Sequence, residues 1–254
     1  MQRWVRFEHQ GREQLGLLQE DRILVHSGDL YNQPQPTGVV LTLAEVQLRR
    51  PVQPTKVIAL WNNFMALAAK LGLQDPAEPL YLIKPPNSYL DPEATIRQPA
   101  QPGKVVFEGE LGIVIGRTAT QVSEALAMDH VFGYTCANDV THADILNRDA
   151  SFAQWVRAKG FDTFCPLGPC VASGLQPEQL VVTTRLNGEV RQNYPISDMR
   201  FSVARLVSAI SADMTLYPGD VILCGTSVGV GSMKPGSTVE VSIEGIGTLR
   251  NHFE

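Results

Sequence analysis

Two acidic side chains interrupt an otherwise apolar stretch of the sequence. Residues 104–116 read KVVFEGELGIVIG, in which a single glycine separates Glu108 from Glu110. Side chains two residues apart in a β-strand point to the same face, so these two carboxylates would lie close together. On a buried face, such a pair needs a proton or a cation. The alternative is an edge strand with two solvent-facing glutamates.

A third carboxylate follows another predicted strand. Asp139 ends the run FGYTCAND, and Thr141 and Asp144 then have the spacing of a capping box, which predicts a helix starting at His142. Three carboxylates that converge from two strands would form an all-oxygen site. Such a site suits a hard divalent ion better than zinc, so we expect Mg²⁺ or Mn²⁺, with Ca²⁺ as an alternative.

Composition limits the classes of protein that can carry such a site. The chain has 254 residues, 44% hydrophobic and 19% charged, as in an ordinary globular protein. Its net charge of -5 argues against nucleic-acid binding. The polar start MQRWVRFEHQ is no secretory signal, and no apolar run approaches the ~18 residues of a membrane helix. We therefore expect a cytoplasmic protein without nucleic-acid or membrane partners. Four cysteines without a C-x-x-C pair are expected to be buried thiols.

The pattern of elements divides the chain near residue 50. Residues 1–50 contain short β runs and a capped turn at Thr42–Glu45, which predicts a small N-terminal β-rich module. Residues 51–254 would form the larger domain. Helices are expected over 64–73, 120–131 and 201–214, and a hairpin turns at Asn187-Gly188. Strands outnumber helices after residue 100, so the predicted class is α+β and mainly β.

Six blocks of the larger domain occur in a recognisable order: FEGELGIVIG, VFGYTCANDVT, AKGFDTFCPLGP, LNGEVRQ, MTLYPGDVILCGTSVGVG and VEVSIEGIGTL. Together they resemble the fumarylacetoacetate hydrolase (FAH) superfamily from about residue 54 to the end, in its acylpyruvate hydrolase and 2-hydroxyhepta-2,4-diene-1,7-dioate isomerase-like branch. The resemblance implies a mixed β-sheet roll with peripheral helices. It also implies a homodimer.

The resemblance carries roles over to individual residues. Glu108, Glu110 and Asp139 match the metal ligands of the family. Lys159 matches a catalytic lysine beside the metal, near the carboxylate of the substrate. Thr226 matches a threonine that helps to hold this carboxylate.

One family feature is missing. Hydrolases of the family activate water with a histidine–glutamate pair in a segment of the form N-Y-x-x-H-x-x-E. Here Asn63-Phe64 matches the start of that segment, which makes Asn63 a candidate substrate-binding residue. Leu67 and Lys70 then stand in place of the histidine and the glutamate. The usual hydrolytic mechanism of the family is therefore in doubt.

Two further positions depart from the family pattern, and they bear on the choice of base. Ala143 replaces an arginine, and Ser227 replaces a proline. His142, beside the missing arginine, is a candidate catalytic base; the alternative is a solvent-facing residue of the first helical turn. Other sources of a base are Lys70 and a water on the metal, and the water is favoured because it needs no new side chain.

Members of the family act on 2-oxo acids, which fixes the substrate class and leaves the reaction open. The first hypothesis is a metal-dependent hydrolase of aromatic-compound breakdown that cleaves a C–C bond of an acylpyruvate such as fumarylpyruvate or maleylpyruvate. The second is an isomerase or decarboxylase of a 2-oxo or 2-hydroxymuconate-type diacid, which the missing pair favours. A third is a non-catalytic relative that binds a ligand.

Overall fold

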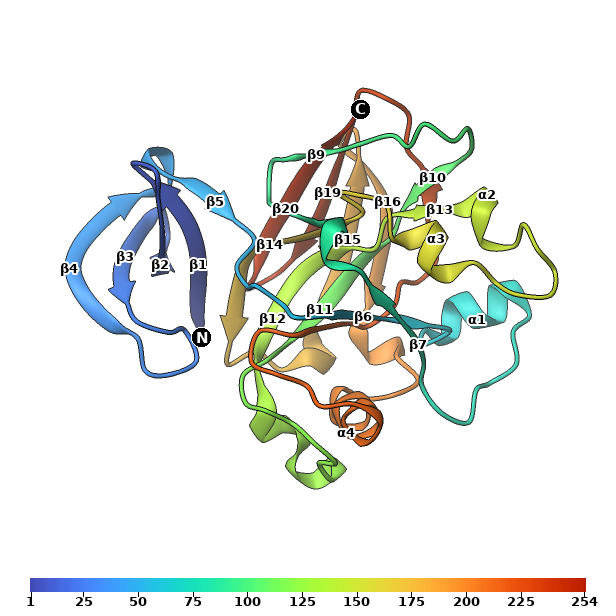
Figure 1. Ribbon diagram of the computed structural model, residues 1–254, viewed down its shortest axis with the longest axis horizontal. Helices are drawn as coiled ribbons and strands as arrows, with labels where there is room; N and C mark the ends of the chain where they lie inside the picture. The colour runs from blue at the N-terminus through green and yellow to red at the C-terminus, as the bar shows by residue number, and fades with distance from the viewer.

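The computed structural model describes residues 1–254, and its strands form sheets of twelve, five and three strands (Figure 1). The main path of the large sheet runs β4-β3-β2-β1-β14-β12-β11-β17-β6-β7, with β5 paired to β1 and β8 to β14. Its strands are β1 Gln2–His9, β2 Arg12–Gln19, β3 Arg22–Ser27, β4 Gln35–Thr42, β5 Gln47–Arg49, β6 Val57–Trp61, β7 Leu80–Lys84, β8 Tyr89–Leu90, β11 Gly109–Ile115, β12 Val131–Asn138, β14 Cys165–Ser173 and β17 Val221–Leu223. The mainly β, α+β class expected from the sequence is confirmed.

Two smaller sheets flank the large one. The five-stranded sheet has the order β16-β15-β19-β20-β9, and the three-stranded sheet the order β13-β10-β18. Their strands are β9 Thr95–Ile96, β10 Val105–Phe107, β13 Thr141–His142, β15 Val181–Leu186, β16 Glu189–Pro195, β18 Gly231–Ser232, β19 Ser237–Ile243 and β20 Gly247–Phe253. The predicted hairpin joins β15 to β16, where Asn187 and Gly188 both have positive φ.

The N-terminal strands form a lobe to one side of the body (Figure 1). Hydrogen bonds nevertheless connect the two parts, because Gln2–Trp4 of β1 pair with Val171–Ser173 of β14. The large sheet therefore runs without interruption from the lobe into the body. The turn expected at Thr42–Glu45 is a single 3₁₀ turn, η1 Leu43–Glu45, in which the Glu45 carboxylate accepts a hydrogen bond from the Thr42 amide.

The main hydrophobic core lies between the large sheet, the five-stranded sheet and the longest helix, α4 Val203–Asp213. Strand β11 contributes Leu111 and Ile113 to this core, while Val114 on its opposite face packs into a second apolar cluster. Both faces of β11 are therefore covered, which explains its nearly continuous apolar sequence. Any polar side chain on this strand lies in a dry environment.

The stretch 104–116 is two strands, so the prediction of one strand was wrong. Residues before Glu108 belong to β10 in the three-stranded sheet, and residues after it belong to β11 in the large sheet. The chain crosses between the sheets where Gly109 lies against Thr184. A Cβ on Gly109 would come within 2.0 Å of the Thr184 hydroxyl oxygen, so only glycine fits there.

Helices are short and lie at the edges of the sheets (Figure 1). They are α1 Met65–Leu71, α2 Ala143–Leu146, α3 Trp155–Lys159 and α4, and 3₁₀ turns span Pro86–Ser88, Glu124–His130, Pro177–Gln179 and Ile196–Asp198. The helix expected over 64–73 is confirmed and ends at Gly72, which has a φ of 65°. The helix expected over 120–131 is instead the 3₁₀ segment Glu124–His130. None of the helices has the length and apolar character needed to cross a membrane.

The capping box expected at Thr141 does not form. Helix α2 begins at Ala143, one residue later than predicted, and it spans a single turn. The Asp144 carboxylate accepts a hydrogen bond from the Lys104 amide, and the Thr141 hydroxyl accepts one from the Lys159 ammonium. Both side chains are thus engaged by other segments, so neither caps this turn.

Candidate metal and substrate site

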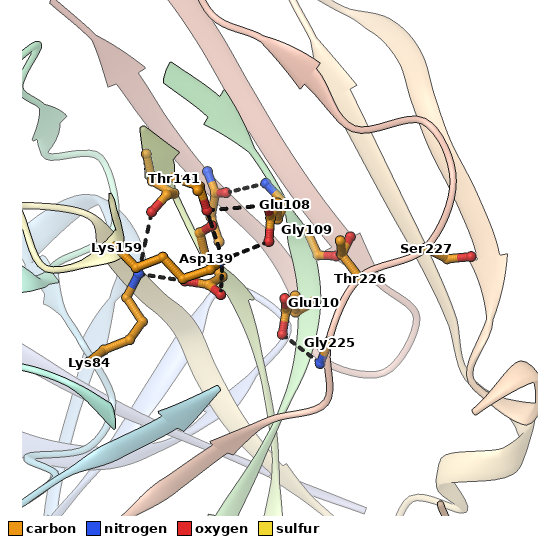
Figure 2. Close-up of polar contacts among 12 residues, drawn as sticks. Lys84, Glu108, Gly109, Glu110, Asp139, Thr141, Lys159, Gly225, Thr226 and Ser227 are labelled. Carbon is orange, nitrogen blue, oxygen red and sulfur yellow. Dashed lines mark hydrogen bonds and ion pairs between the residues drawn. The ribbon is translucent and has the colours of Figure 1, made fainter. Parts of the chain in front are cut away.

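Three carboxylates converge at the junction of the sheets (Figure 2). Glu108 lies at the break between β10 and β11, Glu110 in β11, and Asp139 directly after β12. One carboxylate oxygen from each can be chosen so that all three lie within 4.8 Å of one another. The backbone fixes this geometry, because the Asp139 amide donates to the Glu108 carbonyl over 2.9 Å.

Glu110 is the least compensated of the three acids. Its side chain is fully buried, and Oε2 accepts one hydrogen bond from the Gly225 amide at 2.8 Å. Its other oxygen, Oε1, is buried and has no partner. Burial, followed by the charges of Asp139 and Glu108, raises the pKa of the Glu110 carboxyl well above its usual value. An orphaned carboxylate oxygen in this position is suited to bind a cation.

Lys159 at the end of α3 binds both of the other two acids. Its Nζ donates to Glu108 Oε2 at 2.9 Å, to Asp139 Oδ2 at 2.5 Å and to Thr141 Oγ1 at 2.7 Å. Its side chain is buried, so a solvated surface lysine is excluded. Burial opposes the charge, but the neighbouring carboxylates, Asp139 first, outweigh it and raise the pKa of Lys159. Lys159 therefore stays an ammonium.

Lys84, a second buried lysine, was missed by the sequence reasoning. It ends β7 and is fully buried, and its Nζ donates to Asp139 Oδ1 at 2.5 Å and to the Val140 carbonyl at 3.4 Å. Burial alone would raise the pKa of Asp139, but Lys159 and Lys84 together hold it below its usual value. The signal in the sequence was a cation at the end of the apolar run LYLI, where a strand enters the core.

The segment after β17 closes the site on the side of Glu110 (Figure 2). The Thr226 hydroxyl donates to the Gly109 carbonyl at 3.0 Å, between the two glutamates. Two β16 side chains, absent from the sequence prediction, brace the same point: Gln192 accepts from the Gly109 amide, and Tyr194 donates to its carbonyl. Ser227, in the position where the family has proline, is fully buried, and its hydroxyl has no partner.

Asn63 lies next to this segment, and the nitrogen and the oxygen of its side-chain amide each form a hydrogen bond with a backbone group. Its Nδ2 donates to the Cys224 carbonyl at 2.8 Å, and its Oδ1 accepts from the Phe201 amide at 3.1 Å. Both contacts connect the entrance of α1 to the body. The structure thus places Asn63 beside Gly225 as a tie between segments, with its amide already hydrogen-bonded.

Helix α1 presents no acid–base group toward the interior. Leu67 is half-buried and packs against the main hydrophobic core, and Lys70 is exposed. The helix is fixed in place, because the Ala66 amide donates to Asp198 Oδ2 at 3.0 Å and the Phe64 ring packs edge-on against Tyr194.

The structure does not bring His142 to the acidic cluster. Strand β13 alternates its side chains, so Thr141 faces Lys159 and Glu108 while His142 points to the opposite face. There the imidazole is fully buried, with Nε2 3.3 Å from the Gln101 carbonyl oxygen. His142 therefore does not face solvent.

The donor set fits a hard divalent ion. Glu108, Glu110 and Asp139 offer only carboxylate oxygens, as Mg²⁺, Mn²⁺ and Ca²⁺ prefer, and the unpaired Glu110 oxygen lies among them. Three acids and two lysines leave one net negative charge, so binding of a divalent ion would leave the site cationic. A cationic site suits an anionic ligand.

A mainly β fold that buries converging carboxylates beside two lysines provides a candidate site for a divalent metal ion. The chain belongs to the FAH family, since residues 56–254 match the model described as "Fumarylacetoacetate (FAA) hydrolase C-terminal". Residues 2–51 match a second model, "Rv2993c-like, N-terminal". Membership follows from the matched length, which covers most of the chain.

Named relatives differ in reaction. The chain is 39% identical to the mitochondrial oxaloacetate tautomerase FAHD1 of Arabidopsis thaliana over 80% of this chain and 92% of that protein. Its fold matches a 2-hydroxyhepta-2,4-diene-1,7-dioate isomerase of Mycobacterium marinum with a TM-score of 0.91 and 38% identity, over 100% and 98% of the chains. A fumarylpyruvate hydrolase of Pseudomonas aeruginosa with Mn²⁺ and pyruvate matches with a TM-score of 0.73 and 30% identity, over 82% and 91%. Family membership therefore leaves the reaction open between isomerase, tautomerase and hydrolase.

Proposed function

We propose that this protein is a Mg²⁺- or Mn²⁺-dependent tautomerase that interconverts the keto and enol forms of a short 2-oxo diacid of the oxaloacetate type. The observation that carries the proposal is the position of Leu67, which packs into the main core from helix α1. Lys70, on the same helix, is exposed. This helix therefore offers no general base to activate water.

The two reactions differ in what they require of the protein. Hydrolytic cleavage of an acylpyruvate consumes a water molecule, which a general base must deprotonate. Keto–enol tautomerisation moves one proton between C3 and the C2 oxygen and needs no attacking water. A site that has lost the water-activating pair but keeps its acids and buried lysines can still stabilise the negative charge of an enolate. Two relatives named as a tautomerase and an isomerase support this reaction type.

The residues of the chain have distinct roles in this proposal. Glu108, Glu110 and Asp139 would hold the divalent ion, which supplies Lewis-acid chemistry at the 2-oxo oxygen. Lys159, kept charged by its carboxylate partners, offsets the negative charge of the 2-oxo acid. Thr226 presents a hydroxyl donor for the carboxylate of the substrate. Lys84 donates to the other carboxylate oxygen of Asp139, Oδ1, and so fixes its orientation.

A second candidate is hydrolysis of an acylpyruvate, which the fumarylpyruvate hydrolase match supports. The acidic cluster would serve that reaction as well, but the base would have to come from outside α1. A decarboxylase of the same substrate class would use the same enolate. These reactions differ in their products, so a single panel of substrates separates them.

The experiment uses the purified protein with Mg²⁺ or Mn²⁺ and two substrates. With freshly dissolved oxaloacetate enol, the proposal expects accelerated loss of the enol absorbance, with no release of pyruvate or CO₂ above the rate measured with the same metal and no protein. With fumarylpyruvate, it expects no pyruvate above the uncatalysed rate. Glu110→Gln, which removes a carboxylate without changing the size of the side chain, serves as the inactive control. Pyruvate release from fumarylpyruvate above the rate without protein would establish the hydrolase, and CO₂ release from oxaloacetate above the rate with metal alone would establish the decarboxylase.

A further inference from the structure

Gln192 on β16 is buried among the backbone atoms that connect the two halves of the site. Its Oε1 accepts from the Gly109 amide at 3.0 Å, and its Nε2 donates to Thr226 Oγ1 at 2.8 Å and to the Ser227 carbonyl at 3.1 Å. Both amide protons and the carbonyl oxygen are therefore in use, and the side chain is only 1% exposed. A fully satisfied buried amide is rigid.

This arrangement determines which role the Thr226 hydroxyl can play. A hydroxyl has one proton to donate, and its oxygen also accepts. Because Gln192 donates into that oxygen, the Thr226 proton must point elsewhere. In the structure it points to the Gly109 carbonyl at 3.0 Å. Because Gln192 already donates to the Thr226 oxygen, Thr226 can offer its proton to an incoming anion.

Tyr194 allows the Thr226 hydroxyl to turn away from the Gly109 carbonyl without leaving that carbonyl unpaired. Its hydroxyl donates to the same Gly109 carbonyl at 2.5 Å, so this carbonyl has two donors. If the Thr226 hydroxyl turns to a ligand, the buried carbonyl keeps its bond from Tyr194. No buried acceptor is then left unsatisfied, so the rotation of the Thr226 hydroxyl does not leave an unpaired carbonyl in the interior.

We propose that Gln192 is a positioning residue that commits Thr226 to donate its proton to the carboxylate of the substrate, while Tyr194 replaces Thr226 on the Gly109 carbonyl. The inference rests on the proposed function, which places the substrate carboxylate at Thr226. It predicts that Gln192 and Tyr194 affect anion binding only through Thr226. A purely structural role would not show that dependence.

The test is a double-mutant cycle read out by calorimetry with oxalate, a stable 2-oxo acid analogue, on the Mn²⁺-loaded protein. Gln192→Glu keeps the shape of the side chain but replaces the Nε2 donor with an acceptor, which draws the Thr226 proton to itself. Gln192→Glu and Thr226→Val are each expected to weaken oxalate binding by about tenfold, the loss of one hydrogen bond to an anion. The double variant is expected to be no weaker than Thr226→Val alone. Mn²⁺ affinity should change by less than about threefold in each, as calorimetry without oxalate will show.

The outcomes separate this inference from the proposed function. If the wild-type protein does not bind oxalate, the proposed 2-oxo acid substrate class is wrong, and the positioning role of Gln192 is overturned as well. If Thr226→Val weakens oxalate and Gln192→Glu does not, only the positioning role is overturned. A further tenfold loss in the double variant would also overturn it, because Gln192→Glu would then act through charge. If Gln192→Glu does not fold, Tyr194→Phe runs the same cycle, with an expected loss of about threefold that vanishes in the Thr226→Val background.

Discussion

Replacing Glu110 with glutamine should stabilise the metal-free protein while removing its metal site. Glu110 is fully buried, one of its oxygens has no partner, and the other accepts a single bond from Gly225. A glutamine of the same size can keep the bond from Gly225 through its oxygen. Its amide group then faces the carboxylates of Asp139 and Glu108 as a permanent donor, where the native carboxyl must either hold a proton or bring a third negative charge.

The size of this effect follows from the unpaired oxygen. A buried acceptor without a partner costs about 1–3 kcal/mol, and more when it is charged, so we expect Glu110→Gln to add about 2 kcal/mol to the free energy of unfolding. For a chain of this length, that corresponds to a rise in Tm of about 4–8 °C.

The stabilisation should depend on pH in a defined direction. The folded state raises the pKa of Glu110 above the ordinary value of 4.5, so it binds the proton more tightly than the unfolded chain does. The penalty of the native glutamate is therefore absent below that ordinary value, and it grows as the pH rises toward the folded pKa. The advantage of Glu110→Gln should accordingly be larger at pH 8 than at pH 5.

Glu108→Gln is the matched control, because the same change two residues away should have the opposite sign. Burial raises the pKa of the Glu108 carboxyl as well, but less than that of Glu110, because Glu108 accepts a hydrogen bond from the buried Lys159 ammonium. Removing one member of a buried pair destabilises by about 3–5 kcal/mol, and since Lys159 keeps Asp139 we expect about 3 kcal/mol here.

Thermal unfolding in EDTA at both pH values measures the stability, and calorimetry with Mn²⁺ measures the metal affinity. Both variants should lose Mn²⁺ binding, while only Glu110→Gln gains stability. The reasoning is refuted if Glu110→Gln is less stable than wild type at pH 8, or if it binds Mn²⁺ as tightly as wild type.

Three further predictions concern the lysines and the remaining base candidates. Lys84→Met should lower the free energy of unfolding by about 3 kcal/mol at pH 7, measured in urea; because Lys84 lowers the pKa of Asp139, the loss should shrink as the pH falls and Asp139 takes up a proton. Lys159→Met should lower kcat/KM by about a hundredfold, or about 2.7 kcal/mol, with Mn²⁺ still bound; a change under about threefold would rule out a catalytic role. His142→Ala and Lys70→Ala should each cost less than about tenfold in turnover, because His142 points away from the cluster and Lys70 is exposed, whereas a thousandfold loss in His142→Ala would make it the base.

The sequence was a better guide to which residues converge than to the path of the backbone. The spacing of Glu108 and Glu110 indicated a common face, and the two carboxylates do lie together. Yet the chain passes from one sheet to another next to Gly109, a glycine that lies against Thr184, 75 residues away in the sequence. Periodicity within a strand carries no information about such a distant contact.

The local capping signal gave a wrong prediction, because residues distant in the sequence form hydrogen bonds with the same side chains. Thr141 and Asp144 have the spacing of a capping box, but Lys159 and Lys104 bind them instead, so the helix starts at Ala143 and ends within one turn. The hairpin at Asn187-Gly188 was predictable because its signal lies in the turn itself. A cap is a weaker signal, since its side chains can find stronger partners elsewhere.

Lys84 and Gln192 were missed for a different reason. Each acts by lying opposite another segment: Lys84 faces Asp139 across 55 residues, and Gln192 faces Gly109 across 83. Three buried carboxylates need more than one buried cation, and the lysine at the end of the apolar run LYLI is a candidate for the second cation. The buried amide had no comparable signal, because glutamine is common on exposed strands.

The distribution of charge explains why the site needs an ion even though it already contains two lysines. Lys84 and Lys159 both bind Asp139, and Lys159 also binds Glu108, so the ammonium groups lie on one side of the cluster. Glu110, on the other side, receives only a backbone amide. Without an ion, that carboxyl can remain buried by holding a proton, as its raised pKa indicates. An incoming divalent ion would displace this proton, so the affinity of the wild-type protein for Mn²⁺ should increase with pH over the range in which Glu110 ionises, and calorimetry in buffers of different ionisation enthalpy should detect proton release when Mn²⁺ binds.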